Sequence, residues 1–178
     1  SRAKFFCNQP RKIYHERMNI KPLNILLADD DLDDCQFFEA ALKKLPEATN
    51  LTVVHDGEAL MKLLMTMVNN LPDVLFLDLN MPRKNGFECL TEIKNHPKLS
   101  KLPIIVFSTS FDQARANMLY NNGAQYFMRK PAEFAQLKDL IQLALTHIVE
   151  DLATAKTENI TQPEPANFIL TVQSGIAA

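Results

Sequence analysis

Hydrophobic and polar positions follow two patterns that alternate five times between about residues 23 and 148. The first pattern is a short, continuous run of apolar or β-branched residues between turn-forming residues. Such runs are typical of strands that are buried on both faces of a parallel sheet. They predict strands over Asn24–Ala28, Leu51–His55, Val74–Leu77, Ile104–Phe107 and Tyr126–Arg129.

The second pattern is helical and lies between and after the predicted strands. Apolar residues recur there at spacings of three and four, which places each set on one side of a helix. The five sets are Phe38, Leu42 and Leu45; Leu60, Leu63, Leu64 and Met67; Phe87, Leu90 and Ile93; Ala114, Met118 and Leu119; and Phe134, Leu137, Ile141, Ala144, Leu145 and Ile148. Strands that alternate with helices predict an α/β fold: a doubly wound, five-stranded parallel sheet with helices on both faces.

The two ends of the chain lack these patterns. Residues 1–21 hold six lysines and arginines against a single acid, Glu16. We expect residues 1–19 to be a disordered basic extension that precedes a domain over 20–148; the alternative is an arm that docks on an acidic partner. The tail over 149–178 is rich in Thr, Ala, Gln and Pro and is predicted to be disordered, with at most a marginal strand near its end.

Composition narrows the class of protein. The chain has 178 residues, 47% hydrophobic and 22% charged, with a formal net charge of −2. That balance suits one globular domain with extensions and gives no support for direct binding to nucleic acid. The cysteines (Cys7, Cys35 and Cys89) lie far apart and the histidines are scattered, so disulfide and zinc-site spacings are absent. Without a signal peptide or an apolar run of about 20 residues, we expect a cytoplasmic protein that does not contact a membrane.

Polar residues whose side chains can take part in chemistry follow four of the predicted strands, at their carboxyl ends. They are the run Asp29-Asp30-Asp31, then Asp78, Ser108 and Lys130. Open parallel sheets bind their ligands outside the carboxyl ends of the strands, where the strand order reverses. We therefore expect these side chains to meet in one pocket.

Asp78 is the candidate nucleophile of this pocket, because a carboxylate can accept a phosphoryl group and form an acyl phosphate. Such a transfer needs a hard cation to neutralise charge, and Mg²⁺ prefers carboxylate oxygens together with waters. Asp29 and Asp30 supply further carboxylates, and like charges that converge in this way repel one another without a cation. The acids that follow, up to Asp34, are better explained by the dipole of the first helix.

Ser108 and Lys130 complete the set. The Ser108 hydroxyl can donate a hydrogen bond to a phosphoryl oxygen; it could instead cap the next helix, although Thr109 or Ser110 is better placed for that. Lys130 is a flexible point charge that can reach a phosphoryl oxygen, and at a strand end among acids an ion pair is favoured over a solvated surface position.

Residues 20–148 resemble a receiver domain of two-component response regulators, of the CheY-like single-domain type. The resemblance is carried by Leu-Leu-Ala-Asp-Asp-Asp, Leu-Asp-Leu-Asn-Met-Pro-x-x-x-Gly, Phe-Ser-Thr and Arg-Lys-Pro, which occur in this order. Each motif alone is weak, but the combination is highly specific. It implies the flavodoxin-like strand order 2-1-3-4-5 and a phosphoryl donor that is a sensor histidine kinase or a histidine phosphotransfer protein.

The resemblance also implies a role for each site residue. Asp78 is the phosphoacceptor, and Lys130 senses the phosphoryl group. Mg²⁺ is held by Asp29 (through water), Asp30, Asp78 and the backbone carbonyl of Asn80. Ser108 and Phe127 form a switch that reshapes the surface of the fourth helix, fifth strand and fifth helix, where a downstream protein target binds. Family members often have Tyr at position 127, and plain core packing explains Phe127 equally well. The resemblance leaves open a monomer or a phosphorylation-linked dimer.

Three other classes fit the residues less well. A phosphorylation-independent pseudo-receiver would not need the complete acidic set. A haloacid-dehalogenase-like phosphatase also uses a strand-end Asp, but it requires a second acid at the position of Asn80. A flavodoxin-like electron carrier binds phosphate on a Ser/Thr/Gly-rich loop, which the acids at 29–31 would repel. We therefore expect a signalling switch that catalyses only its own phosphoryl transfer and dephosphorylation, and not a turnover enzyme.

Overall fold

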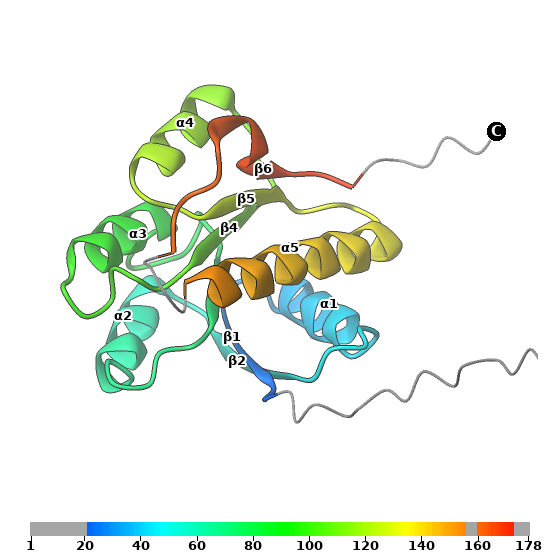
Figure 1. Cartoon of the computed structure of the whole chain (residues 1–178), viewed down its shortest axis with the longest axis horizontal. Helices are drawn as coiled ribbons and strands as arrows, with labels where there is room; N and C mark the ends of the chain where they lie inside the picture. Colours follow the sequence, from blue (N-terminus) through cyan, green and yellow to red (C-terminus); the bar gives the residue numbers. More distant parts are fainter. Residues whose placement is uncertain (1–20, 156–159, 173–178) are drawn as a thin grey trace, which may run out of the picture.

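The structure is a computed structural model that describes residues 21–155 and 160–172. Its centre is a parallel sheet of six strands in the order β2-β1-β3-β4-β5-β6, with helices on both sides (Figure 1). The strands are β1 (Leu23–Ala28), β2 (Thr49–Val54), β3 (Val74–Leu77), β4 (Ile104–Ser108), β5 (Tyr126–Arg129) and β6 (Ile169–Leu170). The helices are α1 (Leu32–Leu42), α2 (Gly57–Thr66), α3 (Gly86–Asn95), α4 (Gln113–Asn121) and α5 (Phe134–Thr154), with a 3-10 turn over Pro165–Asn167.

Each central strand divides its side chains between two cores. Leu26 and Phe127 face a core that is closed by α2, α3 and α4. Ile25 and Phe76 face a second core that is closed by α1 and α5. Because both faces of the sheet are covered, the strands read as continuous apolar runs, and the predicted doubly wound α/β fold is confirmed.

The C-terminal part of the chain corrects two predictions. α5 continues to Thr154, and β6 adds a sixth strand by pairing in parallel with β5. A disordered tail from residue 149 is therefore wrong for 149–155 and 160–172, and the predicted five-stranded sheet has one strand more. A two-residue strand is marginal alone, but the edge of β5 supplies hydrogen-bond partners, and Phe168 and Leu170 are buried.

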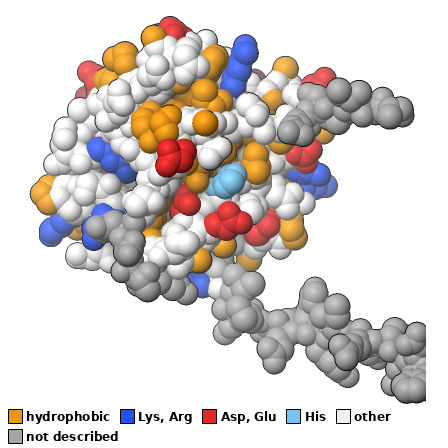
Figure 2. Space-filling model, turned by 45° about the horizontal axis from the view of Figure 1, so that its top comes forward, with side chains coloured by type: hydrophobic (Ala, Val, Ile, Leu, Met, Phe, Trp, Pro, Cys, Tyr) orange, Lys and Arg blue, Asp and Glu red, His pale blue; other side chains and the backbone are white. Residues whose placement is uncertain are grey.

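Other parts of the predicted tails lie outside the described residues: 1–19, 156–159 and 173–178. Within the part of the chain that the structure describes, no helix has the length and apolarity to cross a membrane. Among the described residues on the face drawn in Figure 2, Lys and Arg side chains are scattered between acidic and hydrophobic ones and form no continuous basic patch.

Candidate functional site

The carboxyl ends of β1, β3, β4 and β5 lie side by side at one edge of the sheet (Figure 1). Asp29 follows β1, Asp78 follows β3, Ser108 ends β4 and Lys130 follows β5. Ladder hydrogen bonds keep these ends in register: the Asp78 N–H donates to the Ala28 carbonyl, and the Lys130 N–H donates to the Ser108 carbonyl. The sheet therefore brings four residues that are far apart in sequence to one place.

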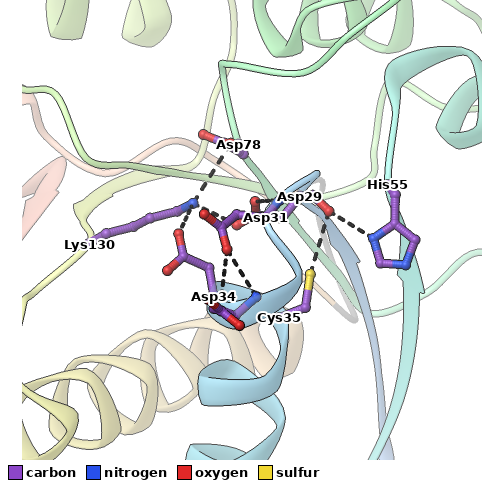
Figure 3. A network of polar contacts seen from close by, with 8 residues as sticks. Asp29, Asp31, Asp34, Cys35, His55, Asp78 and Lys130 are labelled. Atoms are coloured by element: carbon purple, nitrogen blue, oxygen red, sulfur yellow. Dashed lines mark hydrogen bonds and ion pairs between the residues drawn. The ribbon is translucent and has the colours of Figure 1, made fainter.

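Lys130 is the centre of the polar network at this edge (Figure 3). Its Nζ lies 2.6 Å from Asp29 Oδ2, 2.8 Å from Asp34 Oδ2 and 3.7 Å from Asp78 Oδ2. Burial alone would lower the pKa of the ammonium, but its bonds to Asp29 and Asp34 raise that pKa above the ordinary lysine value. Lys130 therefore stays charged and available to pair with an anion.

Asp34 belongs to this network, although the sequence interpretation gave it only a role at the helix dipole. The cap of α1 is Asp31, whose carboxylate accepts from the N–H groups of Asp33 and Asp34. The Asp34 carboxylate is then left to pair with Lys130. A usable signal was its place in the first turn of a helix that begins at the end of β1, since such a turn lies next to the neighbouring strand ends.

Three carboxylates form a cluster that fits a divalent cation. One carboxylate oxygen from each of Asp29, Asp30 and Asp78 lies within 4.8 Å of the others. Asp29 and Asp78 are buried and Asp30 is exposed, so the cluster opens to solvent on one side. Hard cations such as Mg²⁺ prefer oxygen ligands of this kind and keep waters on the open side. The predicted carbonyl ligand, Asn80, is exposed, and its N–H donates to the Asp78 carboxylate.

The acid–base balance of the cluster favours a bound cation. Burial raises the pKa of Asp78 to about 6, against the opposing effect of Lys130 and with a further contribution from Asp29. Burial also raises the pKa of Asp29, although its hydrogen bond with Lys130 acts in the other direction. One ammonium does not compensate for the clustered carboxylates, so additional positive charge would stabilise their ionised form.

Ser108 carries a hydroxyl that is ready for a ligand. The residue is fully buried, and its Oγ has no hydrogen-bond partner within the described ranges. A buried polar group without a partner costs about 1–3 kcal/mol, so a ligand oxygen within reach of this hydroxyl would remove that cost. The structure excludes the capping alternative, including Thr109 and Ser110, because Asp112 caps α4 by accepting from the Ala114 N–H.

Phe127 lies on β5 and pairs in register with Val106, in the middle of β4. Its ring is 2% exposed, and its centroid is 5.7 Å from that of Phe111, in the loop after β4. This environment accounts for Phe127 as a core residue, and its role in a switch stays a prediction.

The loop between β3 and α3 is pressed onto the backbone of the candidate nucleophile. A Cβ atom at Gly86 would lie 2.1 Å from the carbonyl oxygen of Asp78, so no other residue fits there. Within the loop, Arg83 adopts a φ of 66° and pairs with Asp56 at 3.4 Å. Asn85 and Glu88 close a capping box at the start of α3. These contacts explain the glycine of the Met-Pro-x-x-x-Gly motif and give Asp78 a rigid support.

Two side chains that sequence reasoning missed hold the backbone of Asp29. His55 Nδ1 lies 3.0 Å from the Asp29 carbonyl oxygen, and Cys35 Sγ donates to the same oxygen at 3.4 Å (Figure 3). Burial, followed by the charge of Asp29, raises the pKa of the Cys35 thiol to about 11, which keeps it protonated. Nothing in the sequence marked these residues, because they act through a carbonyl that only the fold brings near.

Comparison with known proteins agrees with the resemblance to receiver domains. Residues 25–142 match the family model of the response regulator receiver domain. The response regulator Rcp1 of Synechocystis sp. (strain ATCC 27184 / PCC 6803 / Kazusa) is 30% identical over 146 residues, which cover 80% of this chain and 94% of Rcp1. The two-component response regulator ARR17 of Arabidopsis thaliana is 29% identical over 126 residues, or 66% of this chain and 82% of ARR17.

Two solved structures are also similar. The phosphorylated cyanobacterial phytochrome response regulator RcpA is 27% identical, with a TM-score of 0.65. The match covers 79% of this chain and 100% of the RcpA chain. The Mn²⁺-bound form of Rcp1 is 28% identical, with a TM-score of 0.62, and the match covers 80% of this chain and 100% of that one. One of these relatives was thus seen phosphorylated and another with a divalent metal.

Proposed function

The chain belongs to the response regulator receiver domain family, and on this premise we propose that it is a phosphorylation-dependent signalling switch with Asp78 as its phosphoacceptor. The donor is a phosphohistidine on a sensor kinase or on a histidine phosphotransfer protein. The switch works in the cytoplasm, which suits the two cysteines among the described residues, Cys35 and Cys89, both buried free thiols.

The observation that carries the proposal is the cluster of charged side chains at the carboxyl ends of the strands. Asp29, Asp30 and Asp78 lie close enough to share a cation, and the Lys130 ammonium lies 3.7 Å from Asp78. Phosphoryl transfer depends mainly on positioning and on stabilising charge. Both needs are supported here, by the rigid strand ends and by the clustered charges.

The step itself follows from this chemistry. An Asp78 carboxylate oxygen attacks phosphorus, the P–N bond of the phosphohistidine breaks, and the imidazole leaves as a neutral ring after taking up a proton. Lys130 pairs with a phosphoryl oxygen, and Ser108 donates its unused hydrogen bond to another. Asp29 (through water), Asp30, Asp78 and the Asn80 carbonyl would hold Mg²⁺, which would supply positive charge against the incoming group. Water later attacks phosphorus, which restores the carboxylate and releases phosphate.

The signal then travels through the switch residues. When Ser108 turns toward the phosphoryl group, the Phe127 ring fills the space that it leaves, and the face built by α4, β5 and α5 changes shape. A downstream protein target recognises that changed face. The proposal thus makes the protein a binding switch whose only chemistry is its own phosphorylation and dephosphorylation.

Intact-mass measurement with acetyl phosphate as a small-molecule donor tests the proposal. Wild-type protein with Mg²⁺ gains one phosphoryl group, and the adduct disappears with EDTA and in Asp78→Asn. Asp33→Asn is the matched control, because this neighbouring acid is exposed and lies outside the ion-pair network; it keeps the adduct. A folded, Mg²⁺-binding wild-type protein that gains no phosphoryl group from acetyl phosphate or from a phosphohistidine donor contradicts the proposal and favours an interaction module that is not phosphorylated.

A further inference from the structure

The outer edge of β5 is covered by the chain's own residues 160–170, here called the C-terminal segment. After α5 this segment runs back across the ends of α4 and β5 and ends in β6 (Figure 1). Phe127 donates its N–H to the Phe168 carbonyl at 3.0 Å, and Phe127 and Met128 pair in register with Ile169 and Leu170. The end of the segment, β6, thus adds a short parallel strand to the outer edge of the sheet.

Side chains fix the first half of the C-terminal segment. Gln162 Nε2 donates to the carbonyl oxygens of Tyr120 and Ala124 at 2.8 and 2.7 Å. The Tyr120 hydroxyl donates to the Pro163 carbonyl at 2.9 Å, and Gln125 Nε2 donates to the Thr161 carbonyl at 2.8 Å. These bonds join the first half of the segment to backbone and side-chain groups at the end of α4 and near the start of β5.

One aromatic residue anchors the second half. Phe168 is 3% exposed, and its ring packs edge-on against Tyr120 with centroids 5.3 Å apart. Asn167, directly before it, is exposed. The recognised pattern is therefore an aromatic residue at the end of a 3-10 turn, followed by two aliphatic residues in a strand that runs parallel to β5.

This surface is the one that the proposed function assigns to the downstream target. It includes Phe127, whose backbone N–H is bonded to the C-terminal segment and whose ring packs against Phe111 in the loop after β4. We propose that the C-terminal segment is an internal occupant of the output surface, and that the target displaces it with an extended peptide of the same pattern. The inference rests on the proposed function only in assigning the displacing peptide to the downstream target.

An extended peptide is the partner that the edge of β5 fits. An unpaired strand edge binds extended chains through main-chain hydrogen bonds, and side-chain sites beside the edge add specificity. Here the edge supplies the Phe127 N–H, and Tyr120 supplies the aromatic site. A helix or a flat surface would leave these backbone groups without partners.

The C-terminal segment can be displaced because it is held by only a few local contacts. β6 has only two residues, and short edge elements open with far less free energy than the core. Its covalent link to α5 nevertheless gives it an effective concentration of about millimolar. A competing peptide therefore binds weakly to the intact chain and much more tightly once the internal segment is weakened.

The test uses the full chain and a fluorescein-labelled synthetic peptide with the sequence of residues 160–172. Fluorescence anisotropy is measured with wild type, Phe168→Ala and the exposed control Asn167→Ala. We expect Phe168→Ala to bind the peptide at least about tenfold more tightly than the other two, with Gln162→Ala in between. A peptide that itself carries Phe168→Ala should bind to none of them. Far-UV circular dichroism verifies that each variant is folded.

Two results would overturn the inference. One is equally weak peptide binding by all folded variants. The other is a wild-type dimer by light scattering that Phe168→Ala converts to a monomer, because the segment would then occupy a second copy and not its own chain. Since peptide binding requires no phosphorylation, an absent peptide effect with a normal Asp78 adduct contradicts this inference alone. A missing adduct with normal peptide binding contradicts the proposed function alone.

Discussion

Two lysines at opposite edges of the sheet show how differently this fold treats the same side chain. At the carboxyl edge, the Lys130 ammonium lies among the carboxylates of Asp29, Asp34 and Asp78. At the amino edge, in the last turn of α3, Lys94 donates to the carbonyl oxygens of Ser100 and Leu102 at 3.1 and 2.7 Å. Within the described ranges, Lys94 has no carboxylate at ion-pair distance.

The surroundings shift the two pKa values in opposite directions. Ion pairs outweigh burial at Lys130 and raise its pKa, whereas burial lowers the pKa of Lys94 to about 8. The Lys130 ammonium stays charged among the carboxylates at the carboxyl edge, whereas Lys94 serves as a structural hydrogen-bond donor. The comparison teaches that carboxylates gathered at one edge, and not buried charge as such, distinguish the candidate site.

Removing the charge at the carboxyl edge should have the largest effect on stability. Lys130→Met leaves the buried Asp29 carboxylate without its ion pair, and breaking a buried pair by deleting one partner costs about 3–5 kcal/mol. We expect a loss of this size in the free energy of unfolding, measured by urea denaturation at pH 7 in EDTA, and a partial recovery with Mg²⁺.

Lys138→Met is the matched control for that experiment. This lysine lies on α5, its side chain is 39% exposed, and it pairs only loosely with Asp139 at 3.7 Å. Its replacement should change the free energy of unfolding by no more than about 0.5 kcal/mol. Equal, small effects of the two substitutions would contradict the view that Lys130 compensates for the carboxylates.

The carboxylates themselves should have the next largest effect, and it should depend on pH. The unfolded Asp78 carboxyl has a pKa near the ordinary aspartate value of 3.8, and burial raises the folded value to about 6. Between these values the folded chain holds a proton that the unfolded chain has lost, so metal-free stability falls as pH rises from about 4 to 6. The loss is limited to about 3 kcal/mol, at 1.36 kcal/mol for each pKa unit.

Asp78→Asn removes that loss. In EDTA we expect the variant to be more stable than wild type at pH 7.5, by up to about 3 kcal/mol, and the difference should shrink at pH 4.5. Mg²⁺ should stabilise wild type more than the variant. Asp139→Asn, at an exposed site, should show no such pH-dependent difference. A variant that is less stable than wild type at pH 7.5 in EDTA would contradict the raised pKa.

The sheet and the positions of its strand-end residues could be predicted because both depend on local signals. Continuous apolar runs mark the buried strands, and a polar residue directly after such a run must lie at the carboxyl edge. That reasoning placed Asp29, Asp78, Ser108 and Lys130 correctly at strand ends. Their chemical roles remain part of the proposed function.

The residues that were missed depend on contacts between distant segments. Asp34 has a local explanation in the helix dipole, and its ion pair with Lys130 spans 96 positions of sequence. β6 is too short to carry a periodic signal, and its order comes from the edge of β5. Lys94 looks like any helical lysine, because its carbonyl partners lie in the irregular connection between α3 and β4. Local patterns do not contain such information.

The smallest effect should come from the amino edge, where the pH dependence of stability separates the proton of Lys94 from its hydrogen bonds. Between pH 8 and 10 the folded Lys94 has lost a proton that the unfolded chain, with the ordinary lysine pKa of 10.5, still holds. Wild-type stability should therefore rise with pH across this range relative to Lys94→Met, by at most about 1.4 kcal/mol per pH unit for one proton. Urea denaturation of both proteins at pH 7, 8, 9 and 10 measures the difference and cancels the titration of other groups. Lys101→Met, at an exposed position nearby, should follow wild type at every pH. If the difference between wild type and Lys94→Met stays constant across the series, Lys94 keeps its proton in the folded state, and the contrast between the two edges reduces to their hydrogen-bond partners.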